Sequence, residues 1–263
     1  MLTVYDLPGF PRDLDATALL NCIEAARREI LAVYEKADLM VEYKADRSPL
    51  TLADRLSHAV LNQGLQQLLP GIPVLSEEGA VHDWEVRRQW RLLWLVDPLD
   101  GTRDFVQRTG DFTINVALVE DHIPILGLLD IPLRKTTYLG IRGQGAYRLQ
   151  AGAVESIHTR HGADHRGLKA AISRSHQADE VAWLKAQGFD VGDVVSAGSA
   201  LKFALIAEGQ ADLYPRLGPT MEWDTAAGHC LVAAAGGTVT QVDGTPLLYN
   251  RENLLNPPFL ARG

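Results

Sequence analysis

The chain has 263 residues, of which 46% are hydrophobic, enough to bury a core as one large domain or two closely packed ones. Its formal net charge is −8 and its sequence pI is near 5.5. A general nucleic-acid binder needs a basic surface that neutralises phosphates, so this charge predicts no nucleic-acid partner. If the protein binds anionic phosphates, a metal ion held by carboxylates is the natural source of local positive charge.

The cysteines and the N-terminus restrict the cellular compartment. Two cysteines, Cys22 and Cys230, are too few for a disulfide framework or a thiolate zinc site, so we expect buried free thiols. The N-terminal segment lacks the basic region and long apolar run of a signal peptide, and apolar runs such as 92–96 are too short to cross a bilayer. We expect a cytoplasmic protein, with a peripheral contact to the inner membrane and the oligomeric state left open.

The first half of the chain is predicted to begin with two helices. Apolar residues recur at helical spacing over 15–37, where Asp13 or Asp15 can cap the helix. A second helix is expected over 51–69, with Thr51 as its N-cap.

Strands follow these helices. Two short apolar runs stop at acidic residues, at 72–75 and 92–96. The runs 113–119 and 125–129 predict an antiparallel pair, and two more strands are expected to extend its sheet, at 136–140 and 146–149.

Strands and helices alternate in the second half, which predicts layered α/β structure. The expected strands are 168–172, 191–195, 212–214 and 238–242. The expected helices are 179–187, 199–207 and 225–235. The polar stretch 150–167 is the softest boundary in the chain. We therefore expect an N-terminal half, 1–160, with most candidate metal ligands, and a C-terminal half, 161–263, within one compact unit.

The most informative segment is DPLDGT at 97–102, which directly follows a predicted strand. Pro98 fixes its φ angle and Gly101 permits unusual backbone angles, so the turn can direct Asp97, Asp100 and the Leu99 carbonyl toward one point. Oxygen ligands suit Mg²⁺. The amides of Gly101 and Thr102 can receive a phosphate oxygen if a helical turn starts there. A simple Asp-Pro loop turn is the alternative.

Three further carboxylates are candidates. Glu77 follows the strand 72–75 and can reach a metal held by Asp97. The alternative interpretation of this segment is a solvated acidic loop that binds no metal. Asp224 begins an alanine-rich helix, where it can cap the helix and also bind a metal. Asp54 has capping-box spacing from Thr51, and it can also accept a proton and, with the Thr102 hydroxyl, orient an attacking water.

Taken together, these segments resemble the inositol monophosphatase superfamily of magnesium-dependent phosphomonoesterases. DPLDGT followed by WDTAAG more than a hundred residues later is a highly specific combination, and the resemblance extends to the tail 255–259. Within the superfamily the chain is most similar to bacterial 3'(2'),5'-bisphosphate nucleotidases of the CysQ type, through DPLDGTRDF at 97–105, AGSALKFALIAEG at 197–209 and WDTAAGH at 223–229. The resemblance implies an α/β fold, a layered α/β/α/β/α sandwich.

The resemblance also implies roles for particular residues. Two Mg²⁺ ions, with a third and looser one near Glu77 and Asp54, would be bound by Glu77, Asp97, Leu99, Asp100 and Asp224. Asp54 and Thr102 would be catalytic because they position the attacking water. Substrate contacts would come from Glu77, Leu99, Asp100, Gly101, Thr102, His176, Gly198, Ser199, Lys202 and Asp224.

The second half is expected to determine specificity. Ser199 is predicted to open a helix with Lys202 one turn further on, an arrangement that suits a second phosphate. Arg216 is a weaker candidate. The ordinary alternatives are a solvated helix lysine at Lys202 and a surface loop residue at His176.

These residues together predict hydrolysis of the 3'-phosphate of adenosine 3',5'-bisphosphate, which yields AMP and phosphate. The resemblance to this subfamily implies that the bisphosphate is a by-product of sulfate assimilation. Hydrolysis of 3'-phosphoadenylyl sulfate and sensitivity to lithium stay open. The nearest rival is a phosphatase for inositol phosphates or a related sugar phosphate. A rival of another class is a non-catalytic phosphometabolite sensor, which we disfavour because all candidate ligands, Asp54 and Thr102 are present.

Overall fold

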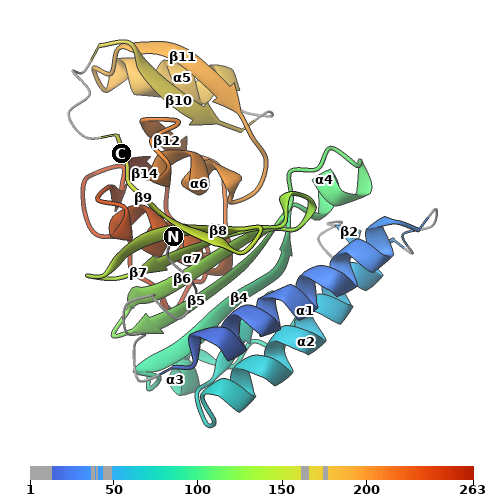
Figure 1. The fold of residues 1–263 in the computed structure, drawn as a ribbon. Helices are drawn as coiled ribbons and strands as arrows, with labels where there is room; N and C mark the ends of the chain where they lie inside the picture. The colour runs from blue at the N-terminus through green and yellow to red at the C-terminus, as the bar shows by residue number, and fades with distance from the viewer. Residues whose placement is uncertain (1–13, 37–38, 40, 44–48, 161–165, 174–176) are drawn as a thin grey trace.

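Two sheets and their helices stack in five layers (Figure 1). The computed structural model describes residues 14–36, 39, 41–43, 49–160, 166–173 and 177–263. Helices α1 and α2 cover one face of a seven-stranded sheet, α6 and α7 lie between this sheet and a five-stranded one, and α5 covers the outer face of the second sheet. This arrangement confirms the expected α/β/α/β/α sandwich.

The N-terminal helices begin where the sequence predicts. In α1 (Ala16–Tyr34), the Asp15 side chain accepts hydrogen bonds from the first-turn amides, so Asp15 rather than Asp13 is the cap. In α2 (Leu52–Leu68), Thr51 and Asp54 form the expected capping box. Two short helices were not predicted, α3 (Trp84–Arg87) and α4 (Thr102–Val106).

The first sheet has the strand order β3-β4-β5-β6-β7-β8-β9, in which β3 and β4 are parallel and the later neighbours are antiparallel. Its strands are β3 (Val74–Ser76), β4 (Leu92–Asp100), β5 (Thr113–Glu120), β6 (Ile123–Ile131), β7 (Thr136–Ile141), β8 (Gly145–Gln150) and β9 (Ala153–Ile157). Two smaller elements, β1 (Glu42–Tyr43) and β2 (Pro49–Leu50), form a separate antiparallel pair, and a 3₁₀ turn spans Pro132–Arg134.

Strand β9 lies within the polar stretch 150–167, which was interpreted as the softest boundary of the chain and for which no strand was predicted. The chain turns at Ala151 and Gly152 and pairs back on β8. Val154 and Ile157 are buried while the residues between them are exposed, so the strand has only two apolar side chains to reveal it. The proposed division at residue 160 stays a prediction.

Both faces of the first sheet are covered, which explains the continuous apolar run in β4. Trp94 and Val96 pack in the cluster formed with α1 and α2. Leu93 and Leu95 point to the other face and pack in the cluster that contains α6 and α7. Alternate side chains of one strand therefore enter two different cores.

The second sheet has the order β11-β10-β12-β14-β13. Its strands are β10 (Leu168–Ile172), β11 (Val191–Ser196), β12 (Leu213–Arg216), β13 (Thr238–Gln241) and β14 (Phe259–Arg262), and the helices are α5 (Gln177–Ala186), α6 (Leu201–Ala207) and α7 (Glu222–Ala234). The C-terminal strand β14 was not predicted. Helix α6 begins two residues after the expected Ser199, and α7 begins three residues before the expected Thr225.

Helix α7 lies unusually close to the first sheet although it belongs to the second half of the chain. A Cβ atom added at Gly127 would lie 2.3 Å from the carbonyl oxygen of Ala227, and one at Gly140 would lie 2.6 Å from the Cα of Leu231. Only glycine permits this approach. The N-terminus of α7 is thereby brought to the edge of the sheet where β3 and β4 end.

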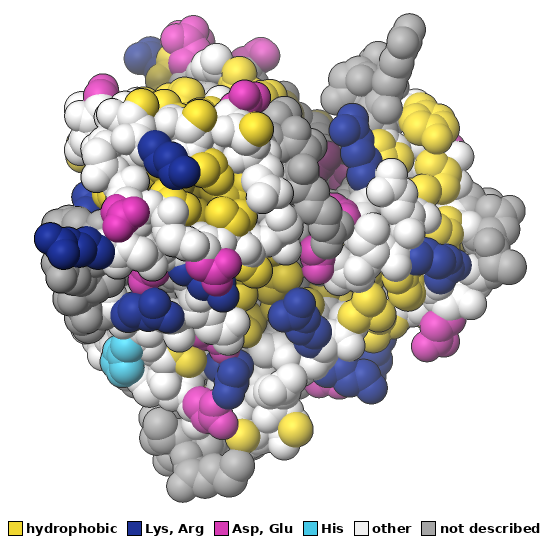
Figure 2. Space-filling view, turned by 90° about the horizontal axis from the view of Figure 1, so that it is seen from above, with side chains coloured by type: hydrophobic (Ala, Val, Ile, Leu, Met, Phe, Trp, Pro, Cys, Tyr) yellow, Lys and Arg dark blue, Asp and Glu magenta, His cyan; other side chains and the backbone are white. Residues whose placement is uncertain are grey.

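On the face drawn in Figure 2, the basic and acidic side chains of the described residues are interspersed. Within the described ranges, no helix combines the length and the apolar character needed to cross a membrane. Cys22 and Cys230 are buried free thiols, as predicted.

Candidate active site

Two carboxylates meet where β3 ends and where the pairing of β4 becomes irregular, between Asp97 and Asp100. The strands are parallel, and Ser76 is paired with Val96, so the residues that follow emerge at the same edge of the sheet. The amide of Glu77 also donates to the carbonyl of Val96, at 3.1 Å. Glu77 and Asp97 are therefore neighbours because of strand register.

A third carboxylate completes the cluster. Glu77, Asp97 and Asp224 each place one oxygen so that all three oxygens lie within 4.8 Å of one another. Asp97 is buried, while Glu77 and Asp224 are partly buried. The cluster joins two strand ends of the first sheet with the first turn of α7, as the sequence motifs predicted for these residues.

Asp100 lies beside this cluster but is engaged differently. Its Oδ2 accepts hydrogen bonds from the amide of Ala200 at 2.7 Å and from the Asn115 side chain at 3.3 Å. Asp100 therefore ties the turn after β4 to the segment that precedes α6. Its predicted role as a metal ligand stays a prediction.

The electrostatics of the cluster favour a bound cation. Burial raises the pKa of Asp97 well above its usual range, and the charges on Glu77, Asp100 and Asp224 raise that pKa further. Burial and the Asp100 charge likewise raise the pKa of Asp224, although the Met221 amide opposes this effect. A set of oxygen donors that repel one another in a buried place fits a hard divalent ion, which would neutralise them. These residues can hold a metal.

The DPLDGT turn has the geometry that its glycine and proline suggested. The carboxylate of Asp97 accepts the amide of Leu99 at 3.0 Å, which closes the turn on itself. Gly101 has φ +88°, and a Cβ atom there would lie 2.9 Å from the carbonyl oxygen of Asp111. Helix α4 begins immediately afterwards at Thr102. Glu77, Asp97, Asp100, Thr102 and Asp224 line one cavity of about 400 Å³, referred to below as the acidic cavity.

Asp54 and Thr102 lie together as predicted. The Thr102 hydroxyl is 3.1 Å from Asp54 Oδ1 and 3.2 Å from the carbonyl oxygen of Leu99. The other oxygen of Asp54 accepts the Thr51 amide and hydroxyl of the capping box, at 2.7 and 2.6 Å. Burial raises the pKa of Asp54 to about 6, despite these hydrogen bonds. One carboxylate therefore both caps α2 and contacts the site.

Two residues of α2 that the sequence analysis missed also contact the site. The hydroxyl of Ser57 donates to the carbonyl of Pro98 at 2.8 Å, and Nδ1 of His58 lies 2.9 Å from the hydroxyl of Ser76. Together with Asp54 they occupy positions i, i+3 and i+4, on one face of the helix. This spacing was the only local indication that Ser57 and His58 accompany Asp54. It could not be interpreted from the sequence, because it does not show which face of α2 lies against β3 and β4.

A second cavity of about 590 Å³ adjoins the acidic cavity and shares with it Asp100, Arg103, Asp104, Pro219 and Asp224. We call it the cationic cavity, because its lining also includes Lys202 and Arg216. Ser173, Gly198 and Ser199 also line this cavity. Three substrate-contact residues predicted in the second half, Gly198, Ser199 and Lys202, therefore lie beside the carboxylate cluster. His176 lies outside the described residues.

Lys202 is buried and is not a solvated helix lysine. Its ammonium group donates to the carbonyls of Ala197 and Ser199, at 3.1 and 2.8 Å, and lies over the ring of Tyr214. Burial lowers its pKa to about 8, although the Asp100 charge opposes this effect. An ammonium group has three donors, so these two bonds leave one for a ligand.

The prediction that Ser199 opens a helix was wrong. Ser199 has φ +44°, in the left-handed region, and α6 begins only at Leu201. The amide of the preceding Gly198 is bound by the Asp111 carboxylate at 3.0 Å. The Ser199 hydroxyl is buried and has no hydrogen-bond partner among the described residues, so it is available to a ligand. This backbone shape has no local sequence signal, because a serine rarely adopts it.

Comparison with known proteins matches this architecture to one family. The family model described as "Inositol monophosphatase family" matches residues 14–261. The chain is 48% identical over 234 residues to the 3'(2'),5'-bisphosphate nucleotidase CysQ of Escherichia coli O157:H7, covering 88% of this chain and 92% of the relative.

Solved structures agree with the sequence comparison. The crystal structure of CysQ from Bacteroides thetaiotaomicron has a TM-score of 0.81 and 40% identity, covering 94% of this chain and 96% of that one. The inositol monophosphatase of Anabaena (Nostoc) sp. PCC 7120 has a TM-score of 0.74 at 23% identity, covering 94% of this chain and 89% of that one. The latter likeness shows the shared fold alone.

Proposed function

Because the chain belongs to the inositol monophosphatase family and is a phosphatase of that family, we propose that it hydrolyses the 3'-phosphate of adenosine 3',5'-bisphosphate with Mg²⁺. The products are AMP and phosphate. The observation that carries the proposal is the adjacency of the acidic and cationic cavities, which share residues that include Asp100, Arg103 and Asp224. A substrate with two separated phosphates can place one in each cavity.

The acidic cavity suits the reacting phosphate. Glu77, Asp97 and the Leu99 carbonyl would hold one Mg²⁺, and Asp97, Asp100 and Asp224 would hold a second. Bound there, Mg²⁺ would supply positive charge and acidify water. The residues themselves need only hold the reacting groups in line, because phosphoryl transfer depends mainly on position and charge.

Asp54 and Thr102 have the arrangement of a proton acceptor and a water-orienting hydroxyl. When the Thr102 hydroxyl donates to Asp54, the oxygen of Thr102 is left to accept a hydrogen bond from the attacking water. The water proton can then pass through the hydroxyl to Asp54. A pKa raised to about 6 by burial suits a base that works near neutral pH.

The cationic cavity suits the second phosphate and the nucleoside. Lys202 offers its remaining donor, Ser199 offers an unpartnered hydroxyl, and Arg216 lines the same wall. We assign Gly198 and Ser199 to substrate contact on this basis, with Gly101 contributing from the wall of the acidic cavity. The activity for which the relatives are named, that of a 3'(2'),5'-bisphosphate nucleotidase, supports this assignment.

The biological role we propose follows from the same substrate. Hydrolysis would clear the nucleotide by-product of sulfate assimilation in the cytoplasm, and 3'-phosphoadenylyl sulfate is a second substrate to test. The relatives that share nearly half of the sequence carry the nucleotidase name, whereas the inositol phosphatase compared above shares only 23%.

The test compares phosphate release from adenosine 3',5'-bisphosphate, 3'-phosphoadenylyl sulfate and inositol 1-phosphate, each with Mg²⁺ and with a chelator. We expect the bisphosphate to be preferred and release to stop with the chelator or with Asp97→Asn. Preference for inositol 1-phosphate would retain the metal site and refute the nucleotide substrate. Binding of the bisphosphate without release of phosphate would support a sensor instead.

A further inference from the structure

The main chain around Met221 orients the carboxylate of Asp224. Met221 is extended and precedes the first residue of α7. Its amide donates to Asp224 Oδ2 at 2.8 Å, and its carbonyl accepts the Asp224 amide at 3.1 Å. The direction of the Asp224 carboxylate therefore depends on the two peptide groups that flank Met221.

Both of these peptide groups are hydrogen-bonded to the loop between β13 and β14 (residues 242–258), called the C-terminal loop below. The carbonyl of Thr220, in the peptide before Met221, accepts the amide of Asn256 at 2.7 Å. In the peptide after Met221, the carbonyl accepts the Asn256 side-chain amide at 2.7 Å and the Glu222 amide donates to the carbonyl of Leu254 at 3.0 Å. The same Asn256 side-chain amide also donates to the Thr225 hydroxyl, at 2.9 Å. Asn256 therefore connects the loop to the first turn of α7.

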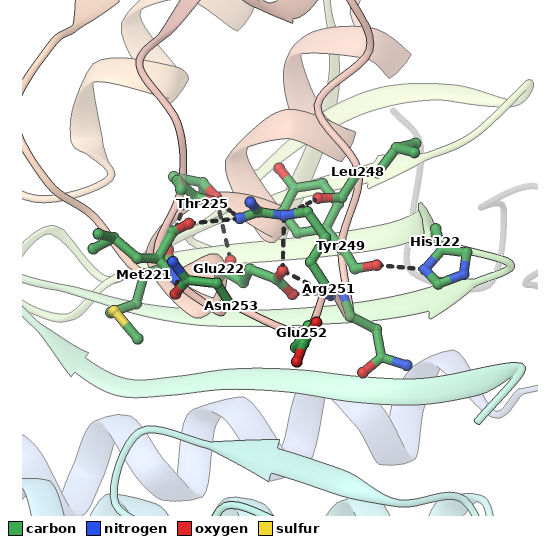
Figure 3. A network of polar contacts seen from close by, with 12 residues as sticks. His122, Met221, Glu222, Thr225, Leu248, Tyr249, Arg251, Glu252 and Asn253 are labelled. Atoms are coloured by element: carbon green, nitrogen blue, oxygen red, sulfur yellow. Dashed lines mark hydrogen bonds and ion pairs between the residues drawn. The ribbon is translucent and has the colours of Figure 1, made fainter. Parts of the chain in front are cut away.

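The loop itself is tied to α7 by an ion pair between the partly exposed Arg251 and the buried Glu222. The side chains of Glu222 and Arg251 point toward one another (Figure 3). The carboxylate of Glu222 accepts the amide of Arg251 at 3.0 Å and lies 3.1 Å from its Nε. Arg251 in turn donates to the side-chain oxygen of Asn256 at 3.1 Å. The side-chain oxygen of Asn256 thus accepts a hydrogen bond from Arg251, while its side-chain nitrogen donates one to the carbonyl of Met221.

We infer that Asn256 is a positioning residue for the metal site, which acts through Met221 on the orientation of the Asp224 carboxylate. This inference rests on the metal-binding part of the proposed function and not on the identity of the substrate. Partners that orient a ligand without touching the metal typically contribute a factor of ten or more to metal affinity. Asn256 is 6% exposed, so water does not readily replace its hydrogen bonds.

The sharpest variant is Asn256→Asp, which has nearly the same shape and keeps the oxygen that accepts from Arg251. It loses the donors to Met221 and Thr225. A control exists in the same loop, because Asn250 is also buried but its side chain bonds Arg87 of α3, and only its main-chain amide bonds α7, at Glu222. Asn250→Ala should weaken the loop without reaching Asp224.

The experiment measures Mg²⁺ affinity without substrate, by calorimetry, and thermal unfolding with a chelator as a separate measure of stability. We expect Asn256→Asp to raise the Kd for Mg²⁺ about tenfold, and Asn250→Ala to leave it within about twofold of the wild-type value while lowering the melting temperature. In activity assays, saturating Mg²⁺ should restore most of the kcat of Asn256→Asp. If that variant does not fold, Asn256→Ala, which adds no charge, replaces it.

Two results would overturn the inference. One is an Asn256 variant that is less stable but binds Mg²⁺ as tightly as the wild type, which would make Asn256 a structural residue only. The other is an equal loss of Mg²⁺ affinity in Asn250→Ala, which would assign the effect to the whole loop. Failure of the wild type to bind any divalent cation would instead refute the metal site itself, along with the proposed function.

Discussion

The two adjoining cavities are built in different ways. The acidic cavity is formed largely by residues at strand ends and in one tight turn, where register and short hydrogen bonds place the side chains. The cationic cavity is formed around the segment before α6, where Asp111 and Asp100, both distant in sequence, hold the amides on either side of the left-handed Ser199. That backbone in turn supplies the carbonyls that bind the buried ammonium group of Lys202.

We propose that the acidic cavity carries the reaction and that the cationic cavity determines substrate preference. The acidic cavity is anchored in the first sheet, whose strands are buried on both faces, so its geometry is difficult to alter. The cationic cavity can change through the loops that line it without disturbing that sheet. We expect changes in the first to abolish turnover and changes in the second to alter substrate preference.

The largest expected effect is that of Asp97→Asn in the acidic cavity. Loss of a buried metal ligand should lower kcat/KM at least about a thousandfold, since metal catalysis supplies several kcal/mol. Stabilisation by added Mg²⁺ should disappear, as measured by thermal unfolding. The control is Asp243→Asn, an exposed turn residue. Retention of more than a tenth of the activity would show that Asp97 does not hold the metal.

The next effect concerns the backbone of the turn and compares two glycines. Gly101→Ala places a Cβ atom on a residue with φ +88° and 2.9 Å from a carbonyl oxygen, whereas Gly71→Ala has φ +85° and open space. We expect a loss of about 2–3 kcal/mol in unfolding free energy for the first and about 1 kcal/mol for the second. Denaturant titration measures both. Equal losses of unfolding free energy in the two variants would mean that the backbone around Gly101 shifts to accommodate the added Cβ atom.

Lys202→Met tests the cationic cavity. Removal of the buried ammonium group should raise the KM for adenosine 3',5'-bisphosphate about tenfold, because a charged hydrogen bond to phosphate is lost. The KM for 3'-AMP, which lacks the second phosphate, should change much less. Lys185→Met, on the exposed side of α5, serves as the control. Parallel losses for both substrates would indicate damage to the acidic cavity through Asp100.

The smallest effect lies outside both cavities, in the part of α7 that packs on the sheet. Burial lowers the pKa of His229 to about 4, below its usual value near 6.5, so the unfolded state binds a proton that the folded state rejects. The contribution to stability is present above pH 6.5 and is lost as the pH falls toward 4. At pH 5.5 the loss is about 1 kcal/mol.

His229→Gln should reduce this acid sensitivity, as measured by denaturant titration at pH 7.5 and pH 5.5 for both proteins. Its hydrogen bond to Tyr249 can be kept by the amide. An unchanged pH dependence in the variant would assign the acid sensitivity to other groups.

The local sequence was sufficient for the strands and helices that carry clear periodicity. The helix caps Asp15 and Thr51 and the antiparallel pair β5 and β6 agree with the structure. The carboxylates were recognisable because strands ended at them. In contrast, β9 was missed because only Val154 and Ile157 of its side chains are buried. Strand β14 has three buried residues, but it is only four residues long and its place is set by pairing with β12 and β13, which are distant in the chain.

The sequence by itself determined the acidic residues, the turn that presents two of them and the family to which the chain belongs. Only the tertiary structure decided that Asp224 meets Glu77 and Asp97, because glycines in the first sheet let α7 approach closely. It also decided that Lys202 is buried and that Ser199 precedes the helix rather than opening it. Such features depend on packing between segments far apart in the chain, which local spacing does not encode.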